Sequence, residues 1–196
     1  MQNRLINNWL RLLSLLVFTS LTGCAVFAVG AVGAAAGTTA VVATDPRNAG
    51  VVVNDNTIET KLQFKYAKYP NSNIYVSSYN GAILLTGQVP DLATKESAVF
   101  EAKVTPGVRQ IYNYLEIRLP QSLGASSQDS FITTQIKTKL FGLKDVSSNN
   151  VKVITTNSVV YLFGIVTQAQ ATEIAKTAAN ISGVEKVVTL FEYVNR

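Results

Sequence analysis

The chain has few side chains that could do catalytic chemistry. Cys24 is the only cysteine among its 196 residues, and histidine is absent. The commonest general base in enzymes is therefore missing, and so is the imidazole that would activate a nucleophilic thiol. One cysteine forms no disulfide within the chain and, without histidine, no Cys/His metal cluster. Because no phosphate-binding glycine loop or nucleophile motif occurs either, we expect no enzymatic activity, cofactor, metal or small-molecule substrate.

The position of Cys24 indicates lipid attachment instead. Residues 1–23 have a basic start, a leucine-rich stretch and small residues before the cysteine, the three parts of a secretory signal. The tetrapeptide Leu21-Thr22-Gly23-Cys24 resembles the lipobox of bacterial lipoproteins, which implies a diacylglyceryl group on the thiol, cleavage before Cys24 and acylation of the new amine. Two or more acyl chains bind a bilayer stably. Ala25 in place of aspartate after the cysteine implies the outer membrane, with the protein facing the periplasm; a chance buried cysteine is the alternative.

The charge of the expected mature chain is mildly positive. The whole sequence carries 17 basic and 12 acidic residues. Loss of Arg4 and Arg11 with the signal leaves 15 against 12, a formal charge of +3. This charge suits an anionic lipid surface, but it falls far short of the basic stripe of a protein that reads duplex DNA. We therefore expect no nucleic-acid partner.

Residues 25–43 are almost wholly small and apolar. At roughly 20 residues the segment is long enough for a membrane-spanning helix, and its glycines would suit close helix contacts. However, glycine, alanine and threonine make a poor lipid-facing surface, and a lipid anchor already fixes the chain to one leaflet. We favour a flexible or surface-lying tether over a membrane span.

The remainder of the chain repeats itself. Three separate stretches recur at nearly constant offsets, which indicates two copies of one unit with insertions between elements. Asp55 corresponds to Asp129 (offset 74), Gly87 to Gly164 (offset 77) and Gly107 to Gly183 (offset 76).

Each copy predicts the element order αββαβ. A helix with apolar residues at helical spacing follows a capping candidate, Asp55 or Asp129, and the acidic residues generally are expected to cap and solvate helices. Asn80-Gly81 and Asn157-Ser158 are hairpin turn signals between the first two strands. Leu84 and Leu162 are expected in the cores of their own units. The predicted strands are 74–79, 82–86 and 109–118, then 151–156, 159–163 and 185–193, and the predicted second helices are 92–104 and 168–181.

This order, the glycine that ends the second strand and the Gly-Val before the last strand resemble the BON domain, a small periplasmic module. The tandem copy, the lipobox and Thr44-Asp45-Pro46-Arg47 are together similar to outer-membrane lipoproteins with two BON domains. The fold is then α+β, with a three-stranded mixed sheet packed on two helices in each domain. The expected segments are a signal peptide (1–23), a lipidated tether (24–54), BON domain 1 (55–118), a linker (119–128) and BON domain 2 (129–196).

The resemblance also implies a function. It implies a non-enzymatic protein that binds anionic phospholipid through the first helix of BON domain 2, supports envelope integrity and is associated with the division site. The alternative is a scaffold for an envelope protein partner, such as a cell-wall amidase activator or an outer-membrane assembly component.

The first helix of domain 2 has two different faces. At about 100° per residue, Ile132, Ile136 and Leu140 share the side expected to be buried. Aromatic, hydroxyl and cationic side chains on the other side would suit lipid headgroups and the acyl boundary. These lipid-binding candidates are Phe131, Thr134, Lys137, Thr138 and Phe141. The open alternative is that Phe131 staples the helix start to its own domain and Phe141 tucks under the following loop.

The matching helix of domain 1 carries Phe64 beside Lys61, Lys65 and Lys68. It could form a second lipid contact. Because two domains with so short a connection must touch, we instead expect Phe64 and the region of Tyr66 and Tyr69 to pack against the other domain or the linker.

Overall fold

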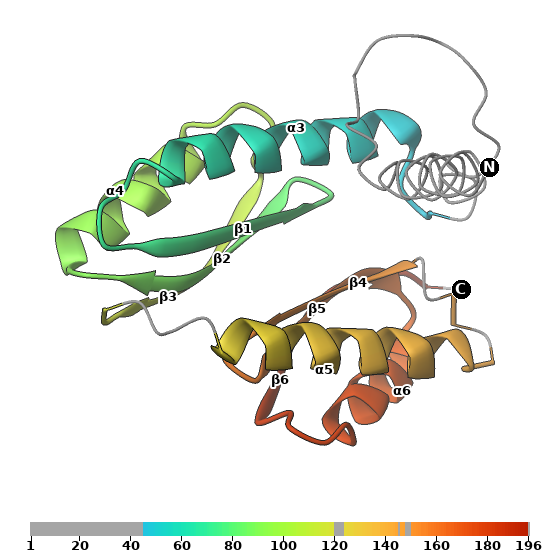
Figure 1. Cartoon of the computed structure of the whole chain (residues 1–196). Helices are drawn as coiled ribbons and strands as arrows, with labels where there is room; N and C mark the ends of the chain where they lie inside the picture. The colour runs from blue at the N-terminus through green and yellow to red at the C-terminus, as the bar shows by residue number, and fades with distance from the viewer. Residues whose placement is uncertain (1–44, 120–123, 145, 148–149, 196) are drawn as a thin grey trace, which may run out of the picture. The chain divides into compact units, whose positions relative to one another are not determined.

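The computed structural model describes residues 45–119, 124–144, 146–147 and 150–195. The expected signal peptide, Cys24 and residues 25–43 lie outside the described residues. The described part of the chain consists of two α-β-β-α-β units, as the repeat predicts (Figure 1). Among these residues, no helix combines the length and apolar character needed to cross a membrane.

The first unit begins with a helix that starts before the expected boundary at residue 55. Its elements are α3 (Ala49–Tyr66), β1 (Asn73–Tyr79), β2 (Ala82–Val89), α4 (Leu92–Lys103) and β3 (Gln110–Ile117). The second unit repeats the order with α5 (Gly124–Phe141), β4 (Val151–Thr156), β5 (Val159–Val166), α6 (Gln168–Ala179) and β6 (Lys186–Tyr193).

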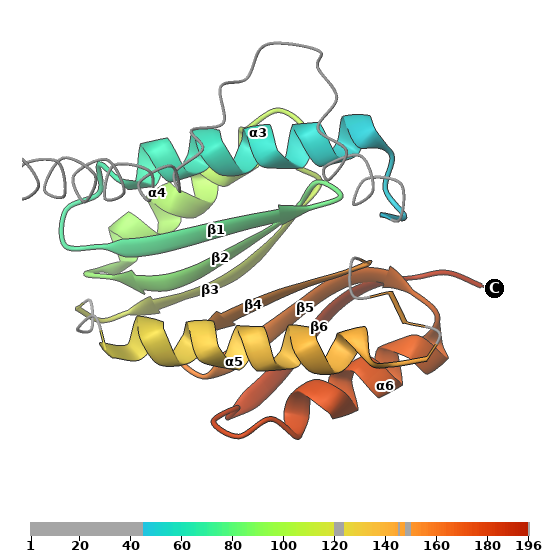
Figure 2. The same cartoon turned by 45° about the vertical axis from the view of Figure 1, so that its right-hand side comes forward.

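Each unit has one three-stranded mixed sheet, as expected. The orders are β1-β2-β3 and β4-β5-β6, and in both sheets the central strand pairs antiparallel with the strand before it and parallel with the last strand. The helix between the second and third strands is the crossover that a parallel pair requires. Figures 1 and 2 show α3 and α4 beside the first sheet, and α5 and α6 beside the second.

The hairpin turns form where the sequence predicts them. Asn80 and Gly81 have φ of 52° and 76°, and Asn157 and Ser158 have φ of 51° and 61°. Two consecutive residues with positive φ match the twist of the flanking strands. Asparagine and glycine adopt this backbone at little cost, whereas Ser158 does so against its usual preference.

The expectation that Asp55 and Asp129 cap helices is wrong. The N-cap of α3 is Asn48, whose side chain accepts a hydrogen bond from Val51 N at 2.9 Å. Asp55 therefore lies inside the helix, and Asp129 lies inside α5. The apolar spacing that suggested a helix start at each aspartate continues a helix that is already under way.

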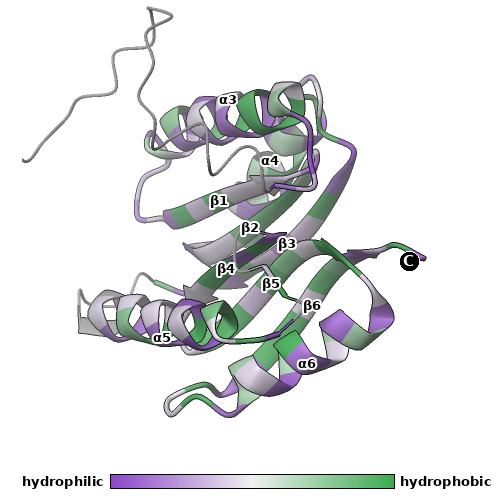
Figure 3. Ribbon diagram, turned by 90° about the vertical axis from the view of Figure 1, so that its right-hand side faces the viewer, coloured by the Kyte–Doolittle hydropathy of each residue, from purple (hydrophilic) through white to green (hydrophobic). Residues whose placement is uncertain are grey.

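Each unit has its own core between helices and sheet. One core includes Ile58, Leu62 and Leu85, and the other includes Ile132, Ile136 and Leu162. A third cluster joins the faces of the two sheets that point away from the helices. In Figure 3 hydrophobic residues follow the strands of both sheets, because both faces of the central strands are covered. The members of this inter-sheet cluster that are buried are Tyr79, Ala82, Leu84, Tyr161, Phe163 and Leu190.

The expectation that Leu84 lies in the core of its own unit is therefore wrong. Leu162 is buried in the core of its own unit, but Leu84 belongs to the inter-sheet cluster. The domain-core counterpart of Leu162 is Leu85, one residue further along β2. Since successive strand residues point to opposite faces, a shift of one residue exchanges the helix-facing and partner-facing sides.

Candidate functional site

The two faces of α5 differ as the sequence predicts. Ile132, Ile136 and Leu140 are fully buried against the second sheet. On the outward side Phe131 is 64% exposed and Phe141 is 82% exposed. A single outward leucine or phenylalanine on a soluble protein needs no explanation, but two on one helix face form an apolar surface with no cover.

Phe131 does not staple the helix start, and Phe141 does not tuck under the following loop, because both side chains are mostly exposed. The structure thereby removes the packing roles considered for them.

The hydroxyl groups of this face are engaged within the helix. Thr134 Oγ1 donates to the Ser130 carbonyl oxygen at 2.9 Å, and Thr138 Oγ1 donates to the Thr134 carbonyl oxygen at 2.9 Å. Both donors are used, so the two threonines offer a headgroup only acceptor lone pairs. The expected contribution of their hydroxyl groups to headgroup binding is therefore smaller than the sequence suggests.

The charged residues between Ser130 and Lys144 all have the same sign. From Ser130 to Lys144 the sequence contains no aspartate or glutamate, and Lys137, Lys139 and Lys144 are exposed. Lysines near the C-terminal end of a helix also complement its dipole. The outward side of α5 thus combines exposed aromatic rings with positive charge.

The expected packing of Phe64 is wrong. Its side chain is 75% exposed on the outward side of α3. Tyr66 is buried in the core of its own unit, where its hydroxyl donates to the Ala98 carbonyl oxygen at 2.7 Å. Tyr69 meets the Tyr66 ring edge-on. The two domains touch through their sheets, so the helices need not provide the contact.

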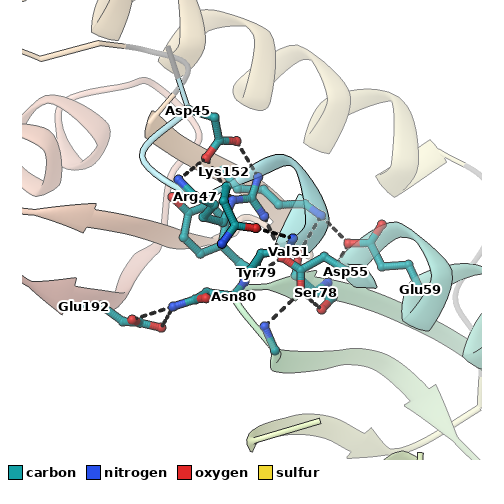
Figure 4. Close-up of polar contacts among 12 residues, drawn as sticks. Asp45, Arg47, Val51, Asp55, Glu59, Ser78, Tyr79, Asn80, Lys152 and Glu192 are labelled. Atoms are coloured by element: carbon teal, nitrogen blue, oxygen red, sulfur yellow. Dashed lines mark hydrogen bonds and ion pairs between the residues drawn. The ribbon is translucent and has the colours of Figure 1, made fainter. Parts of the chain in front are cut away.

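Asp55 holds the β1–β2 turn of domain 1 (Figure 4). Its buried carboxylate accepts hydrogen bonds from Ser78 Oγ at 2.6 Å, Asn80 N at 2.7 Å and Gly81 N at 2.8 Å. A turn whose central residues have positive φ points these N–H groups away from the strand ladder, so they need an acceptor from elsewhere. Arg47 Nη1 also donates to Asp55, at 2.7 Å.

Arg47 connects the start of the described chain to this turn. Its guanidinium donates twice to Asp45, at 3.0 and 2.7 Å, and lies 4.0 Å over the Tyr79 ring. Burial raises the pKa of the Asp45 carboxyl, but the hydrogen bonds and charge of Arg47 outweigh it and leave the pKa below its ordinary value. Burial raises the pKa of Tyr79 to about 12.

Domain 2 repeats the turn contact in simpler form. Asp129 accepts from Asn157 N at 2.8 Å and from Ser158 N at 2.9 Å. Sequence reasoning missed this role for both aspartates. One feature of the sequence could have indicated this role: an aspartate occupies the same position in both repeats, upstream of a turn that begins with asparagine.

Polar contacts surround the apolar contact between the sheets. Asn80 Nδ2 donates to Glu192 Oε2 at 2.8 Å, and Arg109 pairs with the same carboxylate at 3.0 Å. Lys152 of β4 donates to Glu59 of α3. These residues were also missed, because ion pairs between domains leave no periodic pattern in a sequence.

Comparison with known protein families identifies the repeated unit. A sequence model described as "BON domain" matches residues 54–118 and 128–195. The chain belongs to the BON-domain family. The matched ranges coincide with the two α-β-β-α-β units, so each unit is one BON domain.

Three relatives extend this assignment. The chain is 41% identical over 182 residues to outer membrane lipoprotein DolP of Haemophilus influenzae, covering 89% of this chain and 94% of the relative. It is 41% identical over 156 residues to a 21 kDa hemolysin of Actinobacillus pleuropneumoniae, covering 76% and 79%. It is 32% identical over 144 residues to osmotically-inducible protein Y of Escherichia coli K12, covering 70% and 72%. The chain is an outer-membrane lipoprotein with two BON domains, similar to DolP.

Proposed function

We propose that this lipoprotein binds anionic phospholipid through the outward face of α5 in BON domain 2, and that it supports envelope integrity without catalysing a reaction. Its lipid anchor is Cys24, and the body faces the periplasm. The division site is its proposed place of action, as the resemblance to dual-BON lipoproteins implies.

One observation carries the proposal: Phe131 and Phe141 are exposed on one face of a helix, in a stretch from Ser130 to Lys144 that contains lysines and no aspartate or glutamate. Apolar side chains enter the boundary between headgroups and acyl chains, while cations near the surface are attracted by anionic lipid. An acidic side chain on the same face would oppose both contributions.

The expected binding free energies indicate that α5 alone binds lipid weakly and that the lipid anchor strengthens this binding. Full burial of a phenylalanine is worth about 1.5–3 kcal/mol, and each lysine near an anionic surface contributes about 1 kcal/mol. Partial insertion and the cost of orienting the body reduce the sum, so the face alone should bind with modest affinity. Once Cys24 holds the chain at the bilayer, binding by α5 becomes intramolecular and is strengthened by the high local concentration of lipid.

The experiment is co-sedimentation of the body, residues 45–196, with vesicles. The anchor must be absent because it would bind any bilayer, and the two cores and the inter-sheet cluster all lie within this segment. We expect binding to phosphatidylglycerol vesicles, weaker binding as salt screens Lys137 and its neighbours, and none to phosphatidylcholine. No binding to phosphatidylglycerol at low salt would contradict the proposal and favour the scaffold function.

A further inference from the structure

The two BON domains differ on their second helices. α4 and its C-cap residue Val104 expose three large apolar side chains, Leu92, Phe100 and Val104, with Phe100 63% exposed. With the offset of 76 that relates Gly107 to Gly183, the same positions in domain 2 are exposed Gln168, Lys176 and Asn180. The fold therefore tolerates polar residues at all three places, and the apolar residues of domain 1 are not required by the architecture.

Phe100 and Val104 join Phe64 in one surface, which we call the α3–α4 face. Phe64 and Val104 line a shallow pocket together with Lys61, Lys65 and Pro106. Phe100 lines a neighbouring depression with Tyr69 and Glu96. In domain 2 the position of Phe64 is held by Thr138, at the offset of 74 that relates the first helices.

The α3–α4 face and the α5 face lie on opposite sides of the paired sheets. The inter-sheet cluster uses the sheet faces that point away from the helices, so α3 and α4 lie beyond one sheet and α5 lies beyond the other (Figures 1 and 2). A flat bilayer bound by α5 cannot also contact the α3–α4 face. This second surface is then directed away from the membrane.

Shape and charge indicate what the α3–α4 face binds. Phe64 and Val104 are exposed beside a shallow hollow, and such a hollow accepts a projecting side chain, as in protein interfaces. Lys61 and Lys103 are exposed at its border, while Lys65 is paired with Glu101 at 3.6 Å. Exposed lysines that outnumber the unpaired Glu96 favour carboxylates on the occupant.

We propose that the α3–α4 face of BON domain 1 docks a periplasmic protein segment that presents apolar side chains next to carboxylates. This interaction goes beyond lipid binding, and its orientation away from the membrane rests on the proposed binding of lipid by α5. The two copies of the BON domain then have different binding surfaces. Domain 2 binds lipid through its first helix, and domain 1 binds protein through both of its helices.

Photo-crosslinking of the full-length chain in cells tests the proposal. p-Benzoylphenylalanine is placed at Phe100 and, separately, at Val104, with the matched position Lys176 of domain 2 as control. We expect both domain 1 positions to give an adduct with the same protein, in which mass spectrometry locates the cross-linked segment and shows it to contain apolar and acidic residues. The control position should not give this adduct.

Two substitutions decide whether that adduct reflects docking. Lys61→Glu reverses a charge at the border and Phe64→Ser removes apolar contact, and each should reduce the adduct yield roughly tenfold, about 1.4 kcal/mol of binding free energy. Both side chains are exposed, so the unfolding temperature should stay unchanged. Adducts with lipid or a second copy of this chain, an adduct insensitive to both substitutions, or no adduct beyond that of the control would overturn the proposal.

Discussion

The Tyr79 ring stacks on the Phe163 ring, with 5.9 Å between centroids and 8° between planes. Tyr79 belongs to BON domain 1 and Phe163 to BON domain 2, and both side chains are buried. Stacked rings contribute beyond their buried area, so this pair strengthens the contact that joins the domains.

Phe163→Ala should weaken the contact between the domains more than either domain core. Removing a buried phenylalanine costs about 3–5 kcal/mol, and Phe163 belongs to the inter-sheet cluster. We expect calorimetry to resolve two unfolding transitions for Phe163→Ala and a single transition for the wild type. Leu162→Ala is the comparison, because it should destabilise domain 2 itself by about 2–5 kcal/mol. An unchanged single transition in Phe163→Ala would show that the stacked rings do not couple the domains.

Asp55→Ala should destabilise the protein more than Asp129→Ala. Loss of Asp55 leaves the turn N–H groups of domain 1 without their acceptor and the buried Arg47 without one of its partners, at a cost of about 3–5 kcal/mol. Loss of Asp129 affects two turn N–H groups, and among the described residues Asp129 forms no ion pair, so the expected cost is about 1–3 kcal/mol. Urea denaturation measures both; equal losses would mean that Arg47 adds nothing to the contact.

The Asp45–Arg47 pair should make stability sensitive to acid. The pKa of Asp45 is lower in the folded protein than its ordinary value of 3.8, so the folded state holds this proton less tightly than the unfolded state. Its stabilisation is complete above about pH 4 and is lost as the pH falls through the lowered pKa. Asp45→Asn should therefore unfold more easily than wild type at pH 7, and the difference should shrink towards pH 3. A difference that is constant with pH would contradict this origin.

Cys24→Ser should abolish acylation, because a serine hydroxyl is not the nucleophile that thiol alkylation needs. Metabolic labelling with a fatty-acid probe should mark the wild-type protein and leave the variant unlabelled. Continued labelling of the variant would place the lipid elsewhere on the chain.

The repeat explains why so much of the fold could be predicted from the sequence. Its two copies provided independent versions of each helix, turn and strand, and the Asn-Gly and Asn-Ser turns fixed the hairpins. Leu84 was misplaced for a physical reason: in β2 both faces are buried, so hydrophobicity does not tell the helix-facing side from the side that meets the other sheet.

The candidate site could also be predicted only in part from the sequence. The outward position of Phe131 and Phe141 follows from helical periodicity, which is local information. The role of Asp55 depends on a turn N–H group 26 positions away in the chain, and the exposure of Phe64 depends on the domains meeting through their sheets. Both are tertiary facts that spacing along one helix does not contain.

The most direct test of the lipid-binding face compares Phe131→Glu with Phe64→Glu, the same substitution on the exposed face of the first helix of domain 1. Both place a carboxylate on an exposed helix face, so both should leave the fold intact. In an NMR titration of residues 45–196 with phosphatidylglycerol micelles, we predict that wild type and Phe64→Glu shift the amides of α5, and that Phe131→Glu nearly abolishes these shifts. Normal binding by Phe131→Glu, or shifts confined to the amides of α3, would show that α5 is not the helix that meets the membrane.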